Sequence, residues 1–305
     1  MLSIIVPCLN EEASIPLFYE EMLKMLAQLN AQAEFIFVDD GSKDNTLSVL
    51  REIAEKDECV HYISLSRNFG KEAAMLAGLH KACGQFAVTM DADMQDPPSL
   101  IPQMLEAVAS GEYDCAGTRR VSRKGEPFIR SFFARRFYAV MKLFSDIEIV
   151  DGARDFRLMN KAYLDALLTL QERNRFSKGI FPWLGFKTKW FEYENVERTA
   201  GHTKWSFWNL LWYSFDGIVA FSSKPLAIAS ILGILLFLVS ISLIIFIVVR
   251  KIMWGDPVDG WASTICIILF CSGVQLFSVG VLGQYMAKTY TEVKCRPNYL
   301  IREQQ

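Results

Sequence analysis

The sequence predicts an α/β domain with a mostly parallel sheet, followed by two membrane-spanning helices. Over residues 2–117, short apolar runs alternate with amphipathic helical patterns. Strands that alternate with helices are typical of a parallel sheet covered on both faces. Further along the chain, residues 225–249 and 261–286 carry no charged side chain. Charge-free runs of this length are long enough to cross a bilayer.

The elements of the α/β domain follow one another regularly. Each expected strand is a short apolar run, and each expected helix has apolar residues three or four positions apart. Asp44-Asn45-Thr46 is a favourable helix start, and Gly84 is a favourable helix end. The predicted strands are Ser3–Pro7, Glu34–Val38, His61–Leu65, Phe86–Met90 and Tyr113–Ala116, and the predicted helices cover residues 13–29, 44–56, 71–83 and 98–109.

Polar side chains gather directly after the first four predicted strands. Ligands of such sheets bind beyond the carboxyl ends of the strands. One Asp-Gly-Ser sequence alone is a common turn, but four polar clusters at one edge indicate a binding site. The clusters are Asn10-Glu11-Glu12, Asp39-Asp40-Gly41-Ser42, the run from Arg67 to Lys71, and the run from Asp91 to Asp96.

Asp91 and Asp93 are candidate ligands of a divalent cation. Their i, i+2 spacing after a strand lets two carboxylates flank one hard cation, with Gln95 as a further oxygen ligand. Ligation by oxygen alone favours Mg²⁺ or Mn²⁺ over zinc. Such a cation would bridge a diphosphate and stabilise the charge that grows on a leaving nucleotide. Two solvated loop aspartates are the alternative.

The two charge-free runs predict a transmembrane hairpin. A helix of 25 residues reaches about 37 Å, which crosses roughly 30 Å of hydrocarbon with some tilt. The connector Arg250–Gly260 is short, so both outer ends lie on one side of the membrane, and Trp254 and Trp261 border it. More positive charge follows the second span than lies in the connector, which favours a cytoplasmic N-terminal domain. Two buried core helices are the alternative, although such helices normally show a polar face.

Two stretches before the hairpin predict helices on the membrane surface. Residues 127–145 combine apolar side chains at helical spacing with several cations, a pattern that suits an anionic membrane. Residues 205–222 repeat Trp and Phe at a spacing of three to four. An ordinary core helix is the alternative for each. We therefore expect a cytoplasmic domain over residues 1–224 and a cytoplasmic tail over residues 287–305.

Composition narrows the class of protein further. The 305 residues are 51% hydrophobic and 22% charged, with a formal net charge of −2. Because the charge lies mostly before residue 225, these values exclude a disordered chain, a fully soluble enzyme and a nucleic-acid binder that relies on bulk positive charge. The seven cysteines form no CxxC pair, which is typical of a reducing compartment rather than of a disulfide or zinc scaffold.

Taken together, the motifs resemble those of family-two polyprenyl-phosphate glycosyltransferases. They are more similar to bacterial bactoprenol glucosyltransferases than to dolichol-phosphate mannose synthases. The resemblance covers nearly the whole chain and rests on IIVPCLNEE, VDDGSKDNT, SRNFGKEAA, MDADMQDPP, DFRLMN and, after the two spans, VKCRPNYLI. It implies a GT-A-type (Rossmann-like) nucleotide-sugar-binding fold and inverting transfer of one sugar to undecaprenyl phosphate. It also implies Mg²⁺ or Mn²⁺ as cofactor, a location in the bacterial inner membrane and a homotetramer.

The resemblance also assigns roles to residues at matching positions. The nucleotide-sugar pocket would be lined by Pro7, Asn10, Glu11, Asp40 and Asp91, and closed by a mobile loop carrying Arg198 and Lys204. Within that loop, His202-Thr203 stands where relatives more often have a small residue and Ser. The metal would be held by Asp91, Asp93 and Gln95. The acceptor phosphate would be bound by Arg119 and Arg130, with Arg135 and Arg136 as close competitors of Arg130.

Asp155 matches the family's proposed base or acceptor-orienting residue. A phosphate monoester has a second pKa of about 6, so the acceptor is largely a nucleophilic dianion at neutral pH. A general base contributes most when a proton must be removed in the transition state. We therefore expect Asp155 to position the acceptor, or to hold Arg157 and a cation, with a structural Asp–Arg pair as the alternative. The catalytic candidates are Asp93, Asp155 and Arg157.

UDP-glucose is the predicted donor, with UDP-N-acetylglucosamine, UDP-galactose and GDP-mannose as alternatives. A processive polysaccharide synthase would need a wider membrane channel and usually a QxxRW motif, and the run Gln171–Phe176 lacks the Trp. A flippase is disfavoured because a lone hairpin encloses no polar path unless it oligomerises. A non-catalytic scaffold would be expected to have lost the carboxylate pair.

Overall fold

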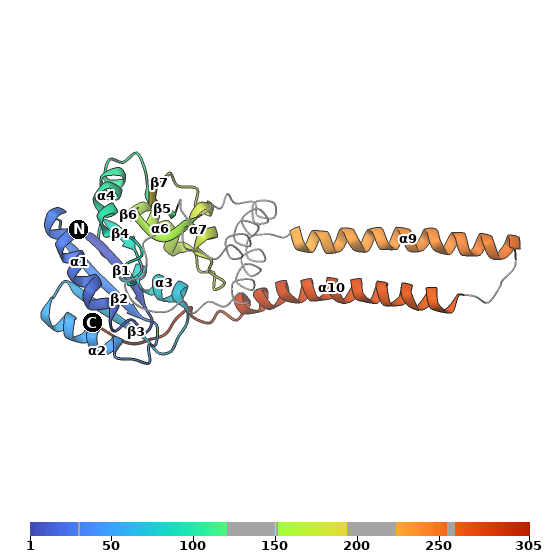
Figure 1. The fold of residues 1–305 in the computed structure, drawn as a ribbon, viewed down its shortest axis with the longest axis horizontal. Coiled ribbons are helices and arrows are strands. Elements are labelled where there is room, and N and C mark those ends of the chain that lie inside the picture. Colours follow the sequence, from blue (N-terminus) through green and yellow to red (C-terminus); the bar gives the residue numbers. More distant parts are fainter. Residues whose placement is uncertain (30, 121–149, 151, 194–223, 255–259) are drawn as a thin grey trace.

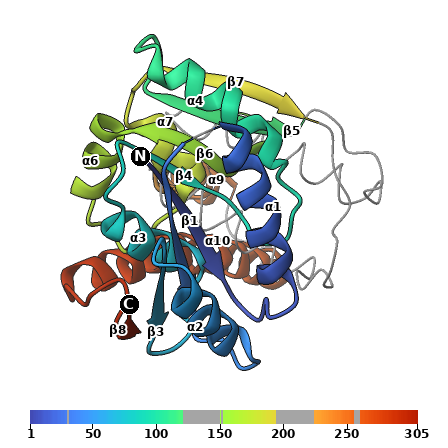
Figure 2. The ribbon, with the colours of Figure 1, turned by 90° about the vertical axis from the view of Figure 1, so that its left-hand side faces the viewer.

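The α/β domain is built on one mixed sheet (Figures 1 and 2). The structure is a computed structural model, and it describes the chain except for residues 30, 121–149, 151, 194–223 and 255–259. Within the described residues the sheet has eight strands in the order β7-β5-β6-β4-β1-β2-β3-β8. The strands are β1 (Leu2–Cys8), β2 (Ala33–Asp39), β3 (Val60–Leu65), β4 (Phe86–Thr89), β5 (Cys115–Arg120), β6 (Ala153–Asn160), β7 (Thr188–Tyr193) and β8 (Ile301–Gln304).

Helices cover both faces of this sheet. Side chains alternate between the two faces of a strand, so Ile4 packs on one side of β1 with α1, α2 and α4, while Ile5 packs on the other side with α3, α6 and α7. Both residues are fully buried, as in a sheet between two helical layers. The helices are α1 (Ser14–Leu29), α2 (Thr46–Lys56), α3 (Lys71–Lys81), the 3₁₀ turn η1 (Pro98–Leu100), α4 (Ile101–Ala109), α6 (Lys161–Thr169) and α7 (Ser177–Trp183).

The fold class predicted from the sequence is confirmed, with shifted boundaries. All five expected strands and all four expected helices are present. The last expected helix begins with the 3₁₀ turn η1, because prolines stand at positions 97 and 98. α3 ends at Lys81 rather than near Gly84, and the Gly84 amide instead donates to Ser3 Oγ at 2.8 Å. The sheet is less parallel than expected, since the pairs β4–β6, β5–β6 and β3–β8 are antiparallel.

Two long helices project from the domain, side by side and antiparallel (Figure 1). They are α9 (Lys224–Trp254) and α10 (Trp261–Val293), and they contain the runs expected to span the membrane. Among the residues searched, one segment, Lys224–Leu243, is apolar enough over sufficient length to be a candidate span. The expected surface helices at 127–145 and 205–222 lie outside the described residues.

The chain returns to the sheet after α10. The residues expected to form a tail first extend α10 to Val293 and then add β8 beside β3. Arg51 on α2 holds β8 through a two-pronged contact with Glu303, at 2.9 Å from Nε to Oε1 and 2.7 Å from Nη2 to Oε2. The α/β domain therefore includes sequence from both sides of the two long helices.

Candidate active site

The loops after β2 and β3 are fixed to one another by a buried carboxylate. Asp40 accepts hydrogen bonds from the amides of Phe69 (2.7 Å) and Gly70 (2.9 Å). Burial raises the pKa of Asp40 above its usual value, although the two amides oppose that shift. Gly41 has φ +69, and a Cβ there would lie 2.6 Å from the Arg67 carbonyl carbon. The Asp40-Gly41 pair thus shapes the sheet edge at which we expected the nucleotide.

The loop after β1 packs against the loop after β2. Asn10 has a left-handed backbone (φ 54), which Asn tolerates better than most residues. Its side-chain oxygen accepts from the Lys43 amide at 2.8 Å, and its own amide donates to Ser42 Oγ at 2.9 Å. The Glu11 amide donates to Thr46 Oγ1 at 2.8 Å. Three of the four polar clusters expected from the sequence therefore meet at one edge, and Pro7 lies on the strand that leads into them.

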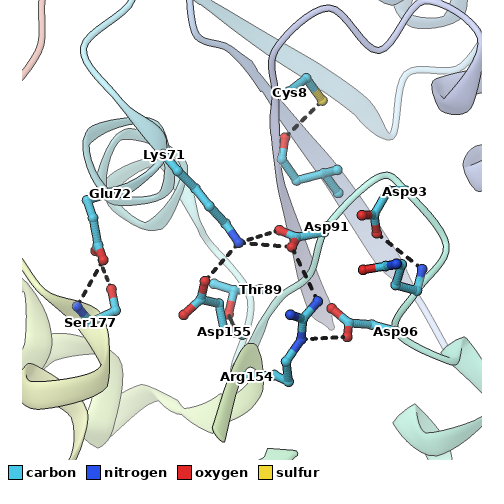
Figure 3. A network of polar contacts seen from close by, with 12 residues as sticks. Cys8, Lys71, Glu72, Thr89, Asp91, Asp93, Asp96, Arg154, Asp155 and Ser177 are labelled. Atoms are coloured by element: carbon cyan, nitrogen blue, oxygen red, sulfur yellow. Dashed lines mark hydrogen bonds and ion pairs between the residues drawn. The ribbon is translucent and has the colours of Figure 1, made fainter. Parts of the chain in front are cut away.

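The centre of the site is a lysine held between two aspartates (Figure 3). Lys71, the first residue of α3, places its Nζ 2.7 Å from Asp91 Oδ1 and 2.8 Å from Asp155 Oδ2. Asp91 follows β4 and Asp155 lies on β6, so the lysine joins two neighbouring strands. Its side chain is 43% exposed.

This contact keeps both partners charged. Burial lowers the pKa of Lys71, but the charges of Asp155 and Asp91 outweigh that effect and raise it well above its usual value. Burial alone would raise the pKa of Asp155, and the charges of Lys71, Lys178 and Arg154 bring it well below its usual value instead. Asp155 is therefore an ionised and weakly basic carboxylate, which suits a positioning role better than that of a general base.

A bulge in β6 brings Asp155 into this position. Gly117 on β5 pairs with Arg157, and Arg119 pairs with Ala153, so β6 has two residues more than β5 between these pairs. A bulge of this kind redirects side chains. Here it lets the consecutive residues Arg154 and Asp155 both join the network around Lys71 (Figure 3), whereas a regular strand would send them to opposite faces.

Two buried hydroxyls satisfy the backbone of the bulge. Thr89 donates to the carbonyl of Asp155 at 2.5 Å, and Thr118 donates to the carbonyl of Phe156 at 3.0 Å. Both threonines are buried, and a buried carbonyl left without a partner is costly. The irregular strand is therefore a stabilised feature of the sheet.

A second ion pair lies beside the first. Arg154 Nε is 3.4 Å from Asp96 Oδ1, and its Nη2 is 4.0 Å from Asp91. Asp96 also accepts from the hydroxyl of Tyr193 at 2.5 Å. Burial raises the pKa of Asp96, and burial together with the Asp96 charge raises the pKa of Tyr193 to about 12. Arg154 therefore fixes the loop that carries the acidic cluster.

The acidic loop after β4 suits a divalent cation. Asp93 Oδ1 accepts from the Gln95 amide at 3.1 Å, and the intervening Met94 has φ 58. This tight turn places two carboxylates, Asp91 and Asp93, in front of the sheet (Figure 3). In the described part of the chain no three His, Cys, Asp or Glu side chains form a metal site by themselves. A cation here would need oxygens from a bound ligand, as Mg²⁺ commonly takes from substrate phosphates.

Asp91 and Asp155 contact Lys71, and Asp91 and Asp96 contact Arg154 (Figure 3). The carboxylate oxygens of Asp91 and Asp93 are donor atoms that fit a divalent cation.

Several residues predicted from the sequence have other contacts. Gln95 Oε1 accepts from Arg120 Nη2 at 3.0 Å, so this expected metal ligand faces a cation. Arg119 Nε donates to Glu192 Oε1 at 3.0 Å. Arg157 does not contact Asp155, and its guanidinium stacks between Phe181 and Trp190. The expected residues Arg130, Arg198 and Lys204 lie outside the described residues.

Sequence reasoning placed Lys71 in a polar cluster at this edge without assigning it a role, and it missed Arg154. Lys71 stands in the first turn of α3, where the helix dipole disfavours a cation. A lysine placed there directly after a Gly was a usable signal that carboxylates lie opposite. No signal was available for Arg154, because a regular β6 would turn either it or Asp155 away from the site.

The family model for glycosyl transferase family 2 matches residues 3–168, which include Lys71, Asp91 and Asp155. The chain belongs to this family. A Bacillus subtilis relative called CsbB is 42% identical over 303 residues, which cover 99% of this chain and 92% of that protein. The bactoprenol glucosyl transferase of Shigella phage SfII is 38% identical over 304 residues, covering 99% of this chain and 97% of that protein. This protein is thus a family-two glycosyltransferase with relatives along its full length.

The matches among solved structures are more distant. Glucosyl-3-phosphoglycerate synthase from Mycobacterium tuberculosis, in complex with Mn²⁺, uridine diphosphate and phosphoglyceric acid, is 21% identical. The match covers 72% of this glycosyltransferase and 76% of that chain, with a TM-score of 0.49.

Proposed function

We propose that this glycosyltransferase moves one glucosyl residue from UDP-glucose to undecaprenyl phosphate. The observation that carries the proposal is the convergence of Asp91 and Asp155 on Lys71, next to Asp93, at the carboxyl edge of the sheet. Full-length similarity to proteins named bactoprenol glucosyl transferase supports glucose as the sugar and the polyprenyl phosphate as the acceptor. The alternative donors are UDP-N-acetylglucosamine, UDP-galactose and GDP-mannose.

Different residues of the site would contact the sugar donor and the lipid acceptor. The loops fixed by Asp40 and Asn10 form the nucleotide side. Asp91 and Asp93 would hold Mg²⁺ or Mn²⁺, which would supply positive charge against the diphosphate. Lys71 holds Asp155 ionised, and Asp155 orients the acceptor. The acceptor needs little help in losing a proton, because a phosphate monoester is largely a dianion above a pKa of about 6. Attack from the face opposite the diphosphate would invert the anomeric centre.

We propose that the two long helices anchor the protein in the membrane. α9 and α10 lie side by side with most of their described apolar side chains exposed, as expected of helices that face lipid. The start of α9 and the end of α10 both lie on the side of the α/β domain (Figure 1), so a hairpin across the inner membrane would keep the catalytic domain on one side. We place that domain in the cytoplasm, where nucleotide sugars are made. A homotetramer remains part of the proposal, on the resemblance alone.

The test is transfer by the purified full-length protein in detergent. With UDP-glucose, undecaprenyl phosphate and Mg²⁺ or Mn²⁺, mass spectrometry should detect a glucosyl phospholipid, and proton NMR should show its β anomer. Parallel reactions receive each alternative donor at the same concentration. Because sites that read hydroxyl groups can reject analogues by orders of magnitude, UDP-glucose should be at least about 100-fold faster than GDP-mannose.

The possible outcomes separate the parts of the proposal. Faster transfer from another donor would overturn glucose and leave the reaction class standing. Hydrolysis of UDP-glucose without lipid product would overturn the acceptor. No reaction with any donor, from protein whose circular dichroism shows a folded domain, would overturn the function as a whole.

A further inference from the structure

Both carboxylate oxygens of Asp91 contact the ammonium of Lys71. Lys71 Nζ lies 2.7 Å from Asp91 Oδ1 and 2.9 Å from Asp91 Oδ2 (Figure 3). Arg154 Nη2 is farther away, at 4.0 Å from Asp91 Oδ2. Asp91 is also one of the two aspartates that we expect to bind Mg²⁺ or Mn²⁺, together with Asp93. One carboxylate is therefore the partner of an ammonium and the expected ligand of a divalent cation.

Two cations on this carboxylate would lie close to one another. A carboxylate oxygen that binds Mg²⁺ directly is about 2.0–2.1 Å from the metal. A metal at that distance from either oxygen of Asp91 could lie no farther than about 5 Å from Lys71 Nζ. The Asp91 side chain is only 25% exposed, and like charges repel one another more strongly where water is partly excluded. The ammonium and the metal therefore weaken one another's binding to Asp91.

Lys71 has a second carboxylate partner, which it would keep. Its Nζ lies 2.8 Å from Asp155 Oδ2. A charge that loses its last partner inside a protein is strongly destabilised, but Lys71 would retain Asp155 after losing Asp91. The flexible four-carbon stem of a lysine permits such a small change of position. After the exchange Asp91 would be paired with the metal, and Asp155 with the ammonium.

The nucleotide side of the site adjoins Lys71. Lys71 begins α3 directly after Gly70, whose φ is +100. The Gly70 amide donates to Asp40 Oδ2 at 2.9 Å, so the residue before Lys71 is fixed to the loop at which we expect the nucleotide. A nucleoside diphosphate at this edge would add oxygen ligands and negative charge to the metal. It would therefore favour the metal over Lys71 at Asp91.

We propose that Lys71 competes with the divalent cation for Asp91, so that the cation binds tightly only together with a nucleoside diphosphate. The proposal rests on the proposed function, from which it takes the cation and the nucleotide. Before they bind, Lys71 compensates the charges of Asp91 and Asp155, two carboxylates that converge on one atom. Once they are bound, Lys71 remains with Asp155. Lys71 thus makes binding of the cation depend on the nucleotide.

Mn²⁺ binding to the purified full-length protein in detergent tests the competition without sugar transfer. Electron paramagnetic resonance measures the free Mn²⁺ during a titration. Without nucleotide, Lys71→Met should bind Mn²⁺ at least tenfold more tightly than the wild type. Lys71→Gln, which also removes the charge but keeps a hydrogen-bond donor, should do the same. The matched control is Lys161→Met, which removes an exposed lysine paired with Asp165 and should bind Mn²⁺ as the wild type does.

Two further measurements locate the effect. Adding Asp93→Asn to Lys71→Met should reverse the gain in Mn²⁺ affinity, because the metal is expected at the acidic loop. Calorimetric titration of UDP into Mn²⁺-saturated protein should give dissociation constants for Lys71→Met and the wild type that differ less than threefold, since Lys71 would remain with Asp155. UDP binding that is tenfold weaker in Lys71→Met would place the ammonium on the diphosphate and overturn the proposal.

The other outcomes separate this proposal from the proposed function. Mn²⁺ binding by both Lys71 variants that is no tighter than that of the wild type, in protein whose circular dichroism shows a folded domain, would overturn the competition. Equal gains in Lys71→Met and Lys161→Met would overturn it as well, because net charge alone would explain them. Tighter Mn²⁺ binding by Lys71→Met, when the wild type transfers no sugar to lipid, would support the competition and overturn the proposed function.

Discussion

At the scale of single residues, the site depends on unequal roles for similar aspartates. Asp93 contacts its own loop through the Gln95 amide, whereas Asp91 and Asp155 contact Lys71. Asp40 has a structural role, because both of its carboxylate oxygens accept hydrogen bonds from backbone amides. Substitutions of these aspartates should therefore have different consequences.

Asp93→Asn should abolish turnover and leave folding unchanged. The change removes one charge that would contact the cation and diphosphate, and it keeps the shape of the side chain. Loss of one charged contact to a transition state typically costs about 3–4 kcal/mol, or 10²–10³ in rate. The rate of lipid glycosylation measures the effect. Asp165→Asn is the matched control, since Asp165 is an exposed helix residue paired with Lys161. A rate within threefold of the control would contradict the metal assignment.

The ion pair of Lys71 and Asp155 should make the activity insensitive to their titration between about pH 5 and 9. A carboxylate with a lowered pKa stabilises the fold above its unfolded pKa of about 3.9, and this stability is lost only as the pH falls through the folded value. A lysine with a raised pKa stabilises the fold below about 10.4, and this stability is lost as the pH rises through the folded value. The acid limb of the rate should therefore report the acceptor phosphate, near pH 6.

Lys71→Met should move that acid limb to higher pH. Without the ammonium, the pKa of Asp155 would rise, because only Lys178 and Arg154 would still oppose the effect of burial, and a protonated Asp155 would no longer orient the acceptor. Profiles of kcat/KM for the acceptor against pH would detect the shift. Lys161→Met, which removes a lysine from an exposed pair, should leave the profile unchanged. Identical profiles for the two variants would show that the Lys71 contact does not control Asp155.

At the scale of elements, the bulge in β6 is the part of the sheet that brings Arg154 and Asp155 into the site. It turns two consecutive side chains toward one cluster, and it depends on the hydroxyls of Thr89 and Thr118. The shape of one strand therefore determines where an ion pair forms.

Thr118→Val should destabilise the domain by about 1–3 kcal/mol, because the buried Phe156 carbonyl loses its partner while the side chain keeps its size. Thermal unfolding followed by circular dichroism would measure the loss. Thr169→Val is the control, since Thr169 is exposed at the end of α6 and donates to its own helix. Turnover should fall together with stability in Thr118→Val only. Equal melting temperatures would indicate that the bulge needs no hydroxyl.

The elements differed in how far the sequence could predict them. The first four strands are largely apolar and buried, and their alternation with helices is regular, so the pattern revealed them. β7 lacks a clear alternation, and β8 has one apolar residue in four. Their pairing is decided by distant partners, which local patterns do not record. For the same reason Asp91 and Asp155 received roles from the sequence, while Lys71 was only placed in a polar cluster and its contact with both aspartates was not predicted.

At the scale of the whole molecule, the end of α10 is attached to the α/β domain. Glu292 accepts from the amides of Arg173 (2.8 Å) and Asn174 (3.0 Å), and Lys288 donates to Asn174 at 2.9 Å. The C-terminal end of α10 is thus hydrogen-bonded to the loop between α6 and α7. These contacts fix the position of the α/β domain relative to the end of α10.

The two ends of the hairpin should differ in their exposure to impermeant reagents. Cys295 lies just after α10 and is exposed, so a variant that keeps only Cys295 should resist a membrane-impermeant maleimide in intact cells. Gly260→Cys in a cysteine-free background places a thiol at the opposite end, and it should react from outside. Gel shifts after labelling, before and after lysis, measure both. Equal labelling of both variants in intact cells would contradict the hairpin.

The pairing of β8 with β3 has a consequence for biogenesis. Strand β8 of the sheet is encoded after both long helices, so it is synthesised after them. The remainder of the sheet can form earlier, but the outer edge of β3 stays open until β8 pairs with it. Completion of the sheet therefore follows synthesis of α9 and α10. A chain that is cut short before β8 keeps an exposed strand edge that chaperones and proteases can detect.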